Sequence, residues 1–118
     1  MNYDLEERTE KFGENIINFV NKIEISVVNK PIISQLIRSA TSIGANYMEA
    51  NQASSKKDFR SKIQISRKEA NETKYWLRML SFSNKDLIDD CKIFWKEAHE
   101  LTLIFAKISN SCVKNLDI

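Results

Sequence analysis

Apolar residues recur every three to four positions along four segments of the chain, a period that is typical of amphipathic helices. The predicted helices cover about residues 4–26, 31–52, 56–83 and 87–114. Helices of this length joined by short loops favour an up-down-up-down arrangement. We therefore predict an all-α fold, an antiparallel four-helix bundle that forms a single domain over residues 1–118. A three-helix core with an outlying first helix is the alternative.

Local signals mark the breaks between the predicted helices. Pro31 suits the first turn of the second helix, where its missing N–H leaves no hydrogen bond unmade. Either Ser54 or Ser55 is expected to cap the third helix, and either Asn84 or Asp86 the fourth. Two glycines and one proline are too few for a turn-rich β-protein, so composition also favours helices.

The third and fourth helices have different apolar stripes. Small residues fill the middle of the third stripe, which consists of Phe59, Ile63, Ser66, Ala70, Thr73, Leu77 and Leu80. The fourth helix has an apolar arc over more than half of its circumference, whereas a bundle helix needs a stripe of about 100° or somewhat more. The excess predicts contact with a second subunit, which we expect at Ile93, Leu101, Ile104 and Ile108.

Composition and termini predict a soluble, cytoplasmic protein with no membrane contact. No segment has the roughly 18 apolar residues that a membrane span requires, and the acidic first residues lack the apolar core of a signal peptide. Cys91 and Cys112 fall on one predicted helix, roughly 30 Å apart at about 1.5 Å per residue. They cannot form a disulfide within the chain, so we interpret both as reduced packing residues.

The sequence lacks the patterns of common catalytic and metal sites. His99 is the only histidine, and Lys96 stands where a Glu-x-x-His di-iron motif needs a glutamate. The position of His99 beside Lys92 and Lys96 indicates a solvated surface histidine. No cysteine or histidine pair has zinc-binding spacing, and Gly13 and Gly44 are isolated rather than part of a phosphate-binding loop. We expect no enzyme activity, no metal and no cofactor.

Positive charge is concentrated in the third helix. The whole chain has a net charge of +2, but residues 55–78 contain eight basic and three acidic side chains, and residues 1–25 contain three basic and six acidic ones. From Arg60 to Arg78, one edge of the third helix carries a row of cationic and amide side chains over about 27 Å, with Lys57 beside it. We predict that this row binds nucleic acid, because lysine and arginine neutralise phosphates. The predicted binding residues are Lys57, Arg60, Gln64, Arg67, Asn71, Lys74 and Arg78.

Two other interpretations of this row stay open. It is an ordinary solvated helix face if neighbouring acids neutralise it, through the i, i+4 pairs Asp58–Lys62 and Lys68–Glu72. It contacts protein if its partner is an acidic surface, such as the first helix of another subunit, where residues 1–25 have a net charge of −3.

Residues 35–50, QLIRSATSIGANYMEA, resemble the signature of the four helix bundle protein family, as do KKDF at 56–59 and ANETKYWL at 70–77. Members are also named after open reading frames in intervening sequences of bacterial large-subunit ribosomal RNA genes. The resemblance implies an antiparallel four-helix bundle and a ring-like homopentamer. A related protein, the accessory variability determinant of diversity-generating retroelements, binds nucleic acid and a reverse transcriptase through a basic surface. Most members have no established function.

The resemblance also assigns roles to three residues and reveals one departure. Arg38, Asn46 and Glu49 match family positions that we assign to structure or assembly. Many members have glycine where this chain has Ala50, so the end of the second helix lacks its usual left-handed residue. The second helix then ends near residue 52 or runs past it.

Residues and resemblance together predict a non-enzymatic, homo-oligomeric helical scaffold, with a pentamer favoured, that binds RNA or structured DNA through the third helix. The alternative is a protein–protein interaction module with no role in nucleic-acid binding. A positive face on the assembled protein favours the first function, and a neutral surface with one large apolar groove favours the second.

Overall fold

The computed structural model of the chain describes the backbone of residues 2–116 and the side chains of residues 4–112. This part forms four long helices, α1 (Asn2–Val20), α2 (Asn29–Asn51), α3 (Lys56–Ser83) and α4 (Ile88–Leu116), with a 3-10 helix, η1 (Lys85–Leu87), before α4. No strand occurs in it, and the all-α prediction is confirmed. The predicted domain also includes Met1, Asp117 and Ile118, which lie outside the described residues.

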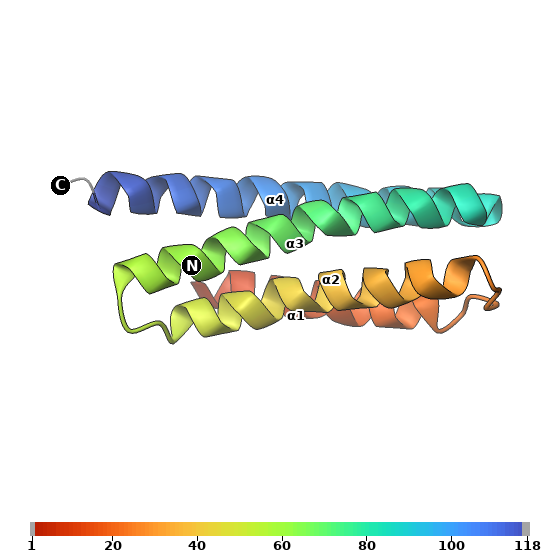
Figure 1. Cartoon of the computed structure of the whole chain (residues 1–118), viewed down its shortest axis with the longest axis horizontal. Coiled ribbons are helices and arrows are strands. Elements are labelled where there is room, and N and C mark those ends of the chain that lie inside the picture. Colours follow the sequence, from red (N-terminus) through yellow and green to blue (C-terminus); the bar gives the residue numbers. More distant parts are fainter. Residues whose placement is uncertain (1, 117–118) are drawn as a thin grey trace.

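Successive helices run in alternating directions along the long axis of the bundle (Figure 1). Contacts between α2 and α3 have the same antiparallel order. The hydroxyl of Ser39 accepts a hydrogen bond from Thr73 at 2.9 Å, whereas Glu49, later on α2, binds Lys62, earlier on α3, at 2.9 Å. The predicted up-down-up-down bundle is therefore confirmed.

One apolar core runs through the bundle, and all four long helices contribute to it. From α1 it takes Phe12, Ile16, Phe19 and Val20, so the alternative with an outlying first helix is wrong. The ring of Phe19 packs on that of Phe94 from α4, with centroids 5.0 Å apart, which joins the first helix to the last. The predicted stripe of α3 is also in place, because six of its residues are buried: Ile63, Ser66, Ala70, Thr73, Leu77 and Leu80.

The first helix ends at Val20, six residues before its predicted end at residue 26. Two polar residues between the end of α1 and the start of α2 bond each other reciprocally. The Ser26 amide donates to Asn29 Oδ1 at 2.8 Å, and the Asn29 amide donates to Ser26 Oγ at 3.0 Å. Asn29 is fully buried and also donates to the Glu24 carbonyl at 3.0 Å. Directly after Val20 the backbone bonds also tighten, because the Lys22 and Ile23 amides donate to carbonyls three residues back, at 3.2 and 3.1 Å. A helical hydrophobic period does not reveal either set of bonds.

The predicted helix caps have mixed outcomes. Ser55 caps α3 as expected, because its hydroxyl accepts a hydrogen bond from the Asp58 amide at 3.0 Å. The prediction that Asn84 or Asp86 caps the fourth helix is wrong, because Asn84 precedes η1 and Asp86 lies within it. Asn84 Oδ1 instead accepts from the Asn29 amide group at 3.3 Å. The second helix ends at Asn51 and does not run past residue 52.

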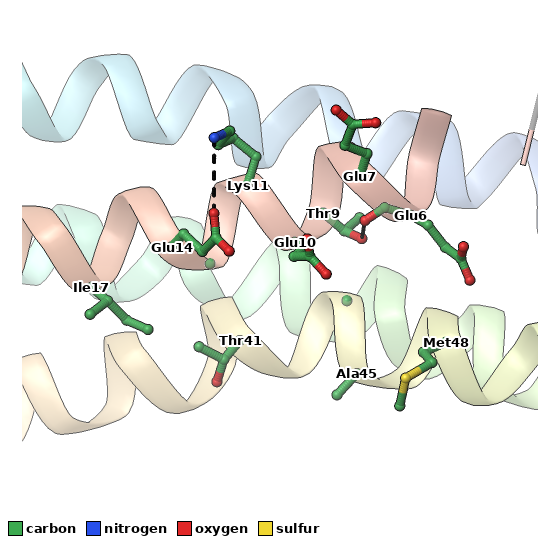
Figure 2. Close-up of a pocket in the computed structure, with 12 residues that line it drawn as sticks. Glu6, Glu7, Thr9, Glu10, Lys11, Glu14, Ile17, Thr41, Ala45 and Met48 are labelled. Carbon is green, nitrogen blue, oxygen red and sulfur yellow. Dashed lines mark hydrogen bonds and ion pairs between the residues drawn. The ribbon is translucent and has the colours of Figure 1, made fainter. Parts of the chain in front are cut away.

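Helices α1 and α2 approach closely at a glycine. A Cβ atom built on Gly44 would lie 3.2 Å from Thr9 Oγ1 and 3.5 Å from the Thr9 carbonyl carbon. Thr9 is 2% exposed, and its hydroxyl donates to the Glu6 carbonyl at 3.0 Å, so it has little room to move. Figure 2 shows Thr9 on α1 directed towards α2 at this point. Gly13 has more room, because a Cβ atom built on it would lie 3.6 Å from its nearest neighbour, Thr41 Cγ2, which is an ordinary van der Waals contact.

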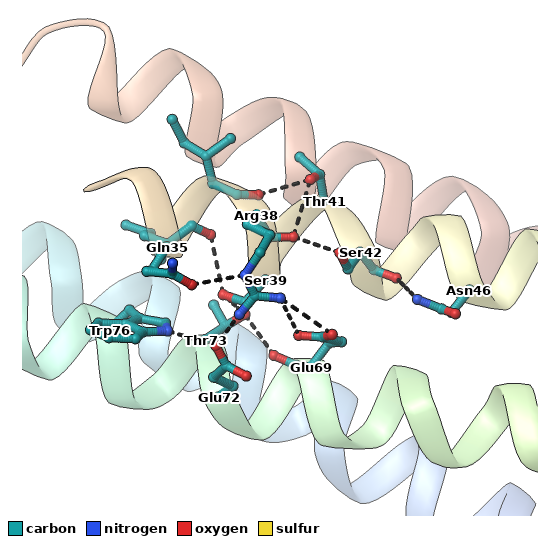
Figure 3. Close-up of polar contacts among 12 residues, drawn as sticks. Gln35, Arg38, Ser39, Thr41, Ser42, Asn46, Glu69, Glu72, Thr73 and Trp76 are labelled. Carbon is teal, nitrogen blue, oxygen red and sulfur yellow. Dashed lines mark hydrogen bonds and ion pairs between the residues drawn. The ribbon is translucent and has the colours of Figure 1, made fainter. Parts of the chain in front are cut away.

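Helices α2 and α3 are joined by polar contacts around Arg38 (Figure 3). Its guanidinium binds Glu69 with 3.1 Å between Nη1 and Oε1, and it also binds Glu72. Gln35 Oε1 accepts from Arg38 Nε at 2.8 Å, and Trp76 Nε1 donates to Glu72 at 2.8 Å. Glu69 is only 9% exposed, so Arg38 supplies the charge that makes burial of this carboxylate tolerable.

The three residues that match family positions all make contacts within the chain. Arg38 and Glu49 form ion pairs with α3, and Asn46 donates to the Ser42 carbonyl at 2.9 Å on its own helix. These contacts give each of them a structural role inside a single subunit.

Alanine at the two glycines should have opposite effects on stability. Gly13→Ala should raise the free energy of unfolding by about 0.5–1 kcal/mol, because alanine favours a helix and has room there. Gly44→Ala should lower it by about 1 kcal/mol, because overpacking against Thr9 outweighs the gain in helix propensity. Urea denaturation of both variants and the wild type measures the difference. Equal stabilisation by both substitutions would show that α1 and α2 are not tightly packed at Gly44.

Loss of the Arg38 side chain should destabilise the bundle. We expect Arg38→Met to lower the free energy of unfolding by about 1–3 kcal/mol, because the buried carboxylate of Glu69 loses its charged donor. Lys62→Met is the matched control and should have a much smaller effect, since its partner Glu49 is more exposed and water screens the pair. If denaturant titrations gave the same decrease in the free energy of unfolding for both variants, Arg38 would have no special role.

Candidate nucleic-acid interface

The residues predicted to bind nucleic acid lie along one side of α3. We call this set the basic face: Lys57, Arg60, Gln64, Arg67, Asn71, Lys74 and Arg78. All of them are exposed except Arg60 and Lys74, which are half-buried. Arg60 Nε is buried without a hydrogen-bond partner in the structure, so its guanidinium lies partly against protein. The side chains of Lys57, Arg67 and Arg78 are exposed to solvent.

The cations of the basic face are not neutralised by nearby acids. Among the described side chains, none of them lies within 4.0 Å of a carboxylate oxygen. The i, i+4 pairs expected between Asp58 and Lys62 and between Lys68 and Glu72 do not form. Lys62 binds Glu49 instead, and Glu72 binds Arg38 across the α2–α3 seam. Contacts with α2 therefore direct Lys62 and Glu72 away from the neighbours on α3 with which they were expected to pair.

Lys74 is held in place by two aromatic rings from α4. Its ammonium group donates to His99 Nδ1 at 3.1 Å and lies 5.2 Å from the centroid of the Trp95 ring. The His99 and Trp95 rings stack with centroids 5.2 Å apart and planes 13° from parallel. The expectation of a purely solvated His99 is therefore wrong, because the antiparallel register places it opposite Lys74. Because an ammonium group only donates, this bond requires an unprotonated Nδ1 on His99.

Helix α4 adds further cations to the same side of the molecule. Lys92 and Lys96 are exposed and line a hollow between α3 and α4 together with Arg78 and Trp95. Lys92, Lys96 and Trp95 lie outside the site predicted from the sequence. Their signal in the sequence is the i, i+3, i+4 spacing of residues 92, 95 and 96, which becomes meaningful once α3 is known to lie beside them.

The opposite side of the bundle is acidic. A groove of about 810 Å³ between α1 and α2 is lined by four glutamates, Glu6, Glu7, Glu10 and Glu14, together with Lys11 and several small or apolar residues. Figure 2 shows these glutamates on α1 around the groove. Because α1 and α2 lie on one side of the bundle and α3 and α4 on the other (Figure 1), acidic and basic surfaces face away from each other.

The residues predicted to contact a second subunit have different environments. Ile93 is 67% exposed, whereas Ile104 and Ile108 are half-buried and pack against the core. Leu101 is fully buried inside its own subunit, so the prediction that it contacts a second subunit is wrong. The bundle itself covers most of the wide apolar arc of α4. Among the described side chains of α4, the large apolar residues that remain exposed are Ile93 and Leu103, and Leu103 is 56% exposed.

The described residues contain no group of three or more histidine, cysteine, aspartate or glutamate side chains placed to hold a metal ion. Cys91 and Cys112 are free thiols, and Cys91 is buried. Burial, helped by the charge of Asp90, raises the pKa of the Cys91 thiol to about 11. A thiol with this pKa is a poor nucleophile at neutral pH. None of the described helices has an apolar stretch long enough to cross a membrane.

Comparisons with known proteins agree with the family resemblance of the sequence. The model of the 23S rRNA-intervening sequence protein family matches residues 1–90. A comparison with curated proteins finds no match. A similar crystal structure is that of a protein of unknown function from the S23 ribosomal protein family of Bacteroides thetaiotaomicron VPI-5482. The two chains are 32% identical, with 92% of this chain and 97% of that chain covered and a TM-score of 0.81. This chain therefore belongs to the 23S rRNA-intervening sequence protein family.

Proposed function

We propose that this protein is a non-enzymatic, homo-oligomeric scaffold that binds RNA or structured DNA through the basic face of α3. The observation that carries the proposal is that the cations of this face have no carboxylate partner among the described side chains. Unpaired cations in a row at helical spacing match a phosphate backbone, and their counterions are released when phosphates bind. Such contacts position a strand without reading its sequence.

Oligomerisation is the second part of the proposal. Ile93 and Leu103 remain exposed on α4 after the core has formed, which supports a contact between subunits there. The family resemblance favours a homopentamer. An assembly would repeat the basic face on each subunit, so modest single sites would add through multivalency.

A protein-interaction module is the alternative, and one observation favours it. Ile25, Val27 and Val28 are exposed in the loop between α1 and α2, and Phe82 is exposed at the end of α3. The hydrogen bond between Asn29 and Asn84 places these two connections at the same end of the bundle. Exposed apolar residues grouped in this way are typical of protein contacts. This alternative replaces the proposal if no nucleic acid binds.

Binding should fall steeply as salt rises and should depend on the basic face. We expect the triple variant Lys57→Gln, Arg60→Gln and Arg67→Gln to bind at least roughly tenfold more weakly near 100 mM salt, with a shallower salt dependence, because phosphate contacts are lost. Filter binding to mixed RNA and DNA from about 50 mM salt upward is the measurement.

The matched control is the triple variant Lys22→Gln, Lys30→Gln and Lys107→Gln, which removes the same number of positive charges. These three lysines are exposed and lie outside the basic face. It should bind nearly as well as the wild type. If the wild type does not bind at the lowest salt, or if both triple variants lose affinity equally, the basic face is not the binding surface.

Assembly should depend on the exposed apolar residues of α4. Ile93→Lys should shift the protein towards monomer while its helix content stays unchanged, because Ile93 contributes little to the core. Met48→Lys is the control, since Met48 is 51% exposed on α2 and lines the groove between α1 and α2 rather than a surface of α4. Light scattering at tens of micromolar measures the mass. A wild-type monomer at that concentration would rule out the proposed assembly.

A further inference from the structure

A hollow of about 440 Å³ lies between the second half of α3 and the first half of α4. Its floor is apolar. Leu77 and Cys91 form the floor and are almost completely buried, and Ile88 and Trp95 are half-buried at its sides. The volume falls within the range of pockets that hold small organic ligands, roughly 300–1,000 Å³. An apolar floor of this kind suits a flat ring or another compact apolar group.

The rim of the hollow is cationic. Arg78 from α3 and Lys92 and Lys96 from α4 line it, and all three are exposed. Among the described side chains, no carboxylate oxygen lies within 4.0 Å of any of these three cations. Even Asp89, which precedes Lys92 by three residues, forms no ion pair with it. Like charges on one helix face repel, so an anion bound at this rim would relieve their repulsion.

The indole of Trp95 is held in a fixed orientation at the side of the hollow. His99 stacks on it, and the ammonium of Lys74 lies over the ring while donating to His99. These contacts restrict rotation of the indole before any ligand binds, so a bound flat ring would meet a preorganised aromatic surface at a low entropic cost.

We infer that this hollow holds one unpaired nucleotide of a bound strand, with its base on the apolar floor beside Trp95 and its phosphate between Arg78, Lys92 and Lys96. The inference rests on the proposed function. An aromatic ring beside cations is the combination that recognises unpaired bases, because every base has a face that stacks and every nucleotide carries a phosphate. A duplex keeps its bases stacked and offers only its backbone.

The hollow is continuous with the basic face. Two residues of the basic face reach it: Lys74 contacts the Trp95 ring, and Arg78 lines the hollow itself. Along α3, Lys57 and Arg78 are separated by about 30 Å at about 1.5 Å per residue. A strand that follows the basic face from Lys57 therefore reaches the hollow after several nucleotides. The structure thus predicts a preference for single strands over duplexes.

Tryptophan fluorescence tests this inference directly. The chain has two tryptophans, so the Trp76→Phe protein reports on Trp95 alone. We expect a single-stranded oligonucleotide to quench Trp95 emission. A strand of equal length with abasic sites should bind through its phosphates with little quenching, and a duplex of equal length should bind more weakly than the single strand. A mononucleotide, inorganic phosphate and an acidic phosphorylated peptide complete the set of probes.

Two variants locate the site in the wild-type background. Trp95→Leu keeps an apolar side chain and should weaken binding of the single strand by roughly tenfold, with little effect on the abasic strand, because stacking of one base is lost. Lys92→Gln with Lys96→Gln should weaken binding of both strands. Lys22→Gln with Lys107→Gln carries the same change in charge on exposed residues outside the hollow and should have little effect.

The outcomes separate this inference from the proposed function. Strand binding that leaves Trp95 emission unchanged, or a duplex that binds as tightly as a single strand, overturns the inference and leaves the basic face as the binding surface. Quenching by the phosphorylated peptide but by no nucleotide also overturns it and assigns the hollow to a protein ligand. Absence of binding by every nucleic-acid probe at about 50 mM salt removes the proposed function and this inference together.

Discussion

The distribution of charge on this bundle depends on how Arg38 holds two carboxylates between α2 and α3. Glu69 and Glu72 are the acidic residues in the middle of α3, and both face α2, where Arg38 binds them. An acid tied to that side cannot reach the far edge of α3, where Arg67 and Lys74 lie. The seam thus joins the two helices and keeps both carboxylates on the α2 side of α3, while the cations on the outer edge have no carboxylate within 4.0 Å among the described side chains.

The same separation of charge extends over the whole bundle. The glutamates of α1 lie around the groove between α1 and α2, and the cations of α3 and α4 gather on the other side. A net charge of only +2 therefore conceals an acidic groove on α1 and a cationic edge on α3. Under the proposed function, such a distribution would attract a polyanion towards the edge of α3 and repel it from the groove. This polarity supports a binding role better than the total charge does.

Helix α4 shows how far a helical wheel can be used. Its apolar arc includes residues that the core buries, such as Leu101 and Phe105, and residues that stay exposed, such as Ile93. The wheel gives the direction of each side chain around the axis, but it does not say how close the neighbouring helices come on either side. The wheel therefore predicts an interface position for Leu101, although the core of its own subunit buries this residue. Packing against α1 and α3 decides which part of the arc remains for another subunit.

The sequence alone determined the helix number, the buried stripe of α3, the cap at Ser55 and the row of cations, because these follow from residue spacing within one segment. The antiparallel order followed from the short connections between segments. The tertiary structure decided which residues meet across segments. Lys74 and His99 are 25 positions apart, and their contact with Trp95 depends on the relative register of α3 and α4. The hollow beside them and the pairing of Arg38 with Glu69 depend on register in the same way. Register is set by the packing of the whole core, so no local pattern encodes it.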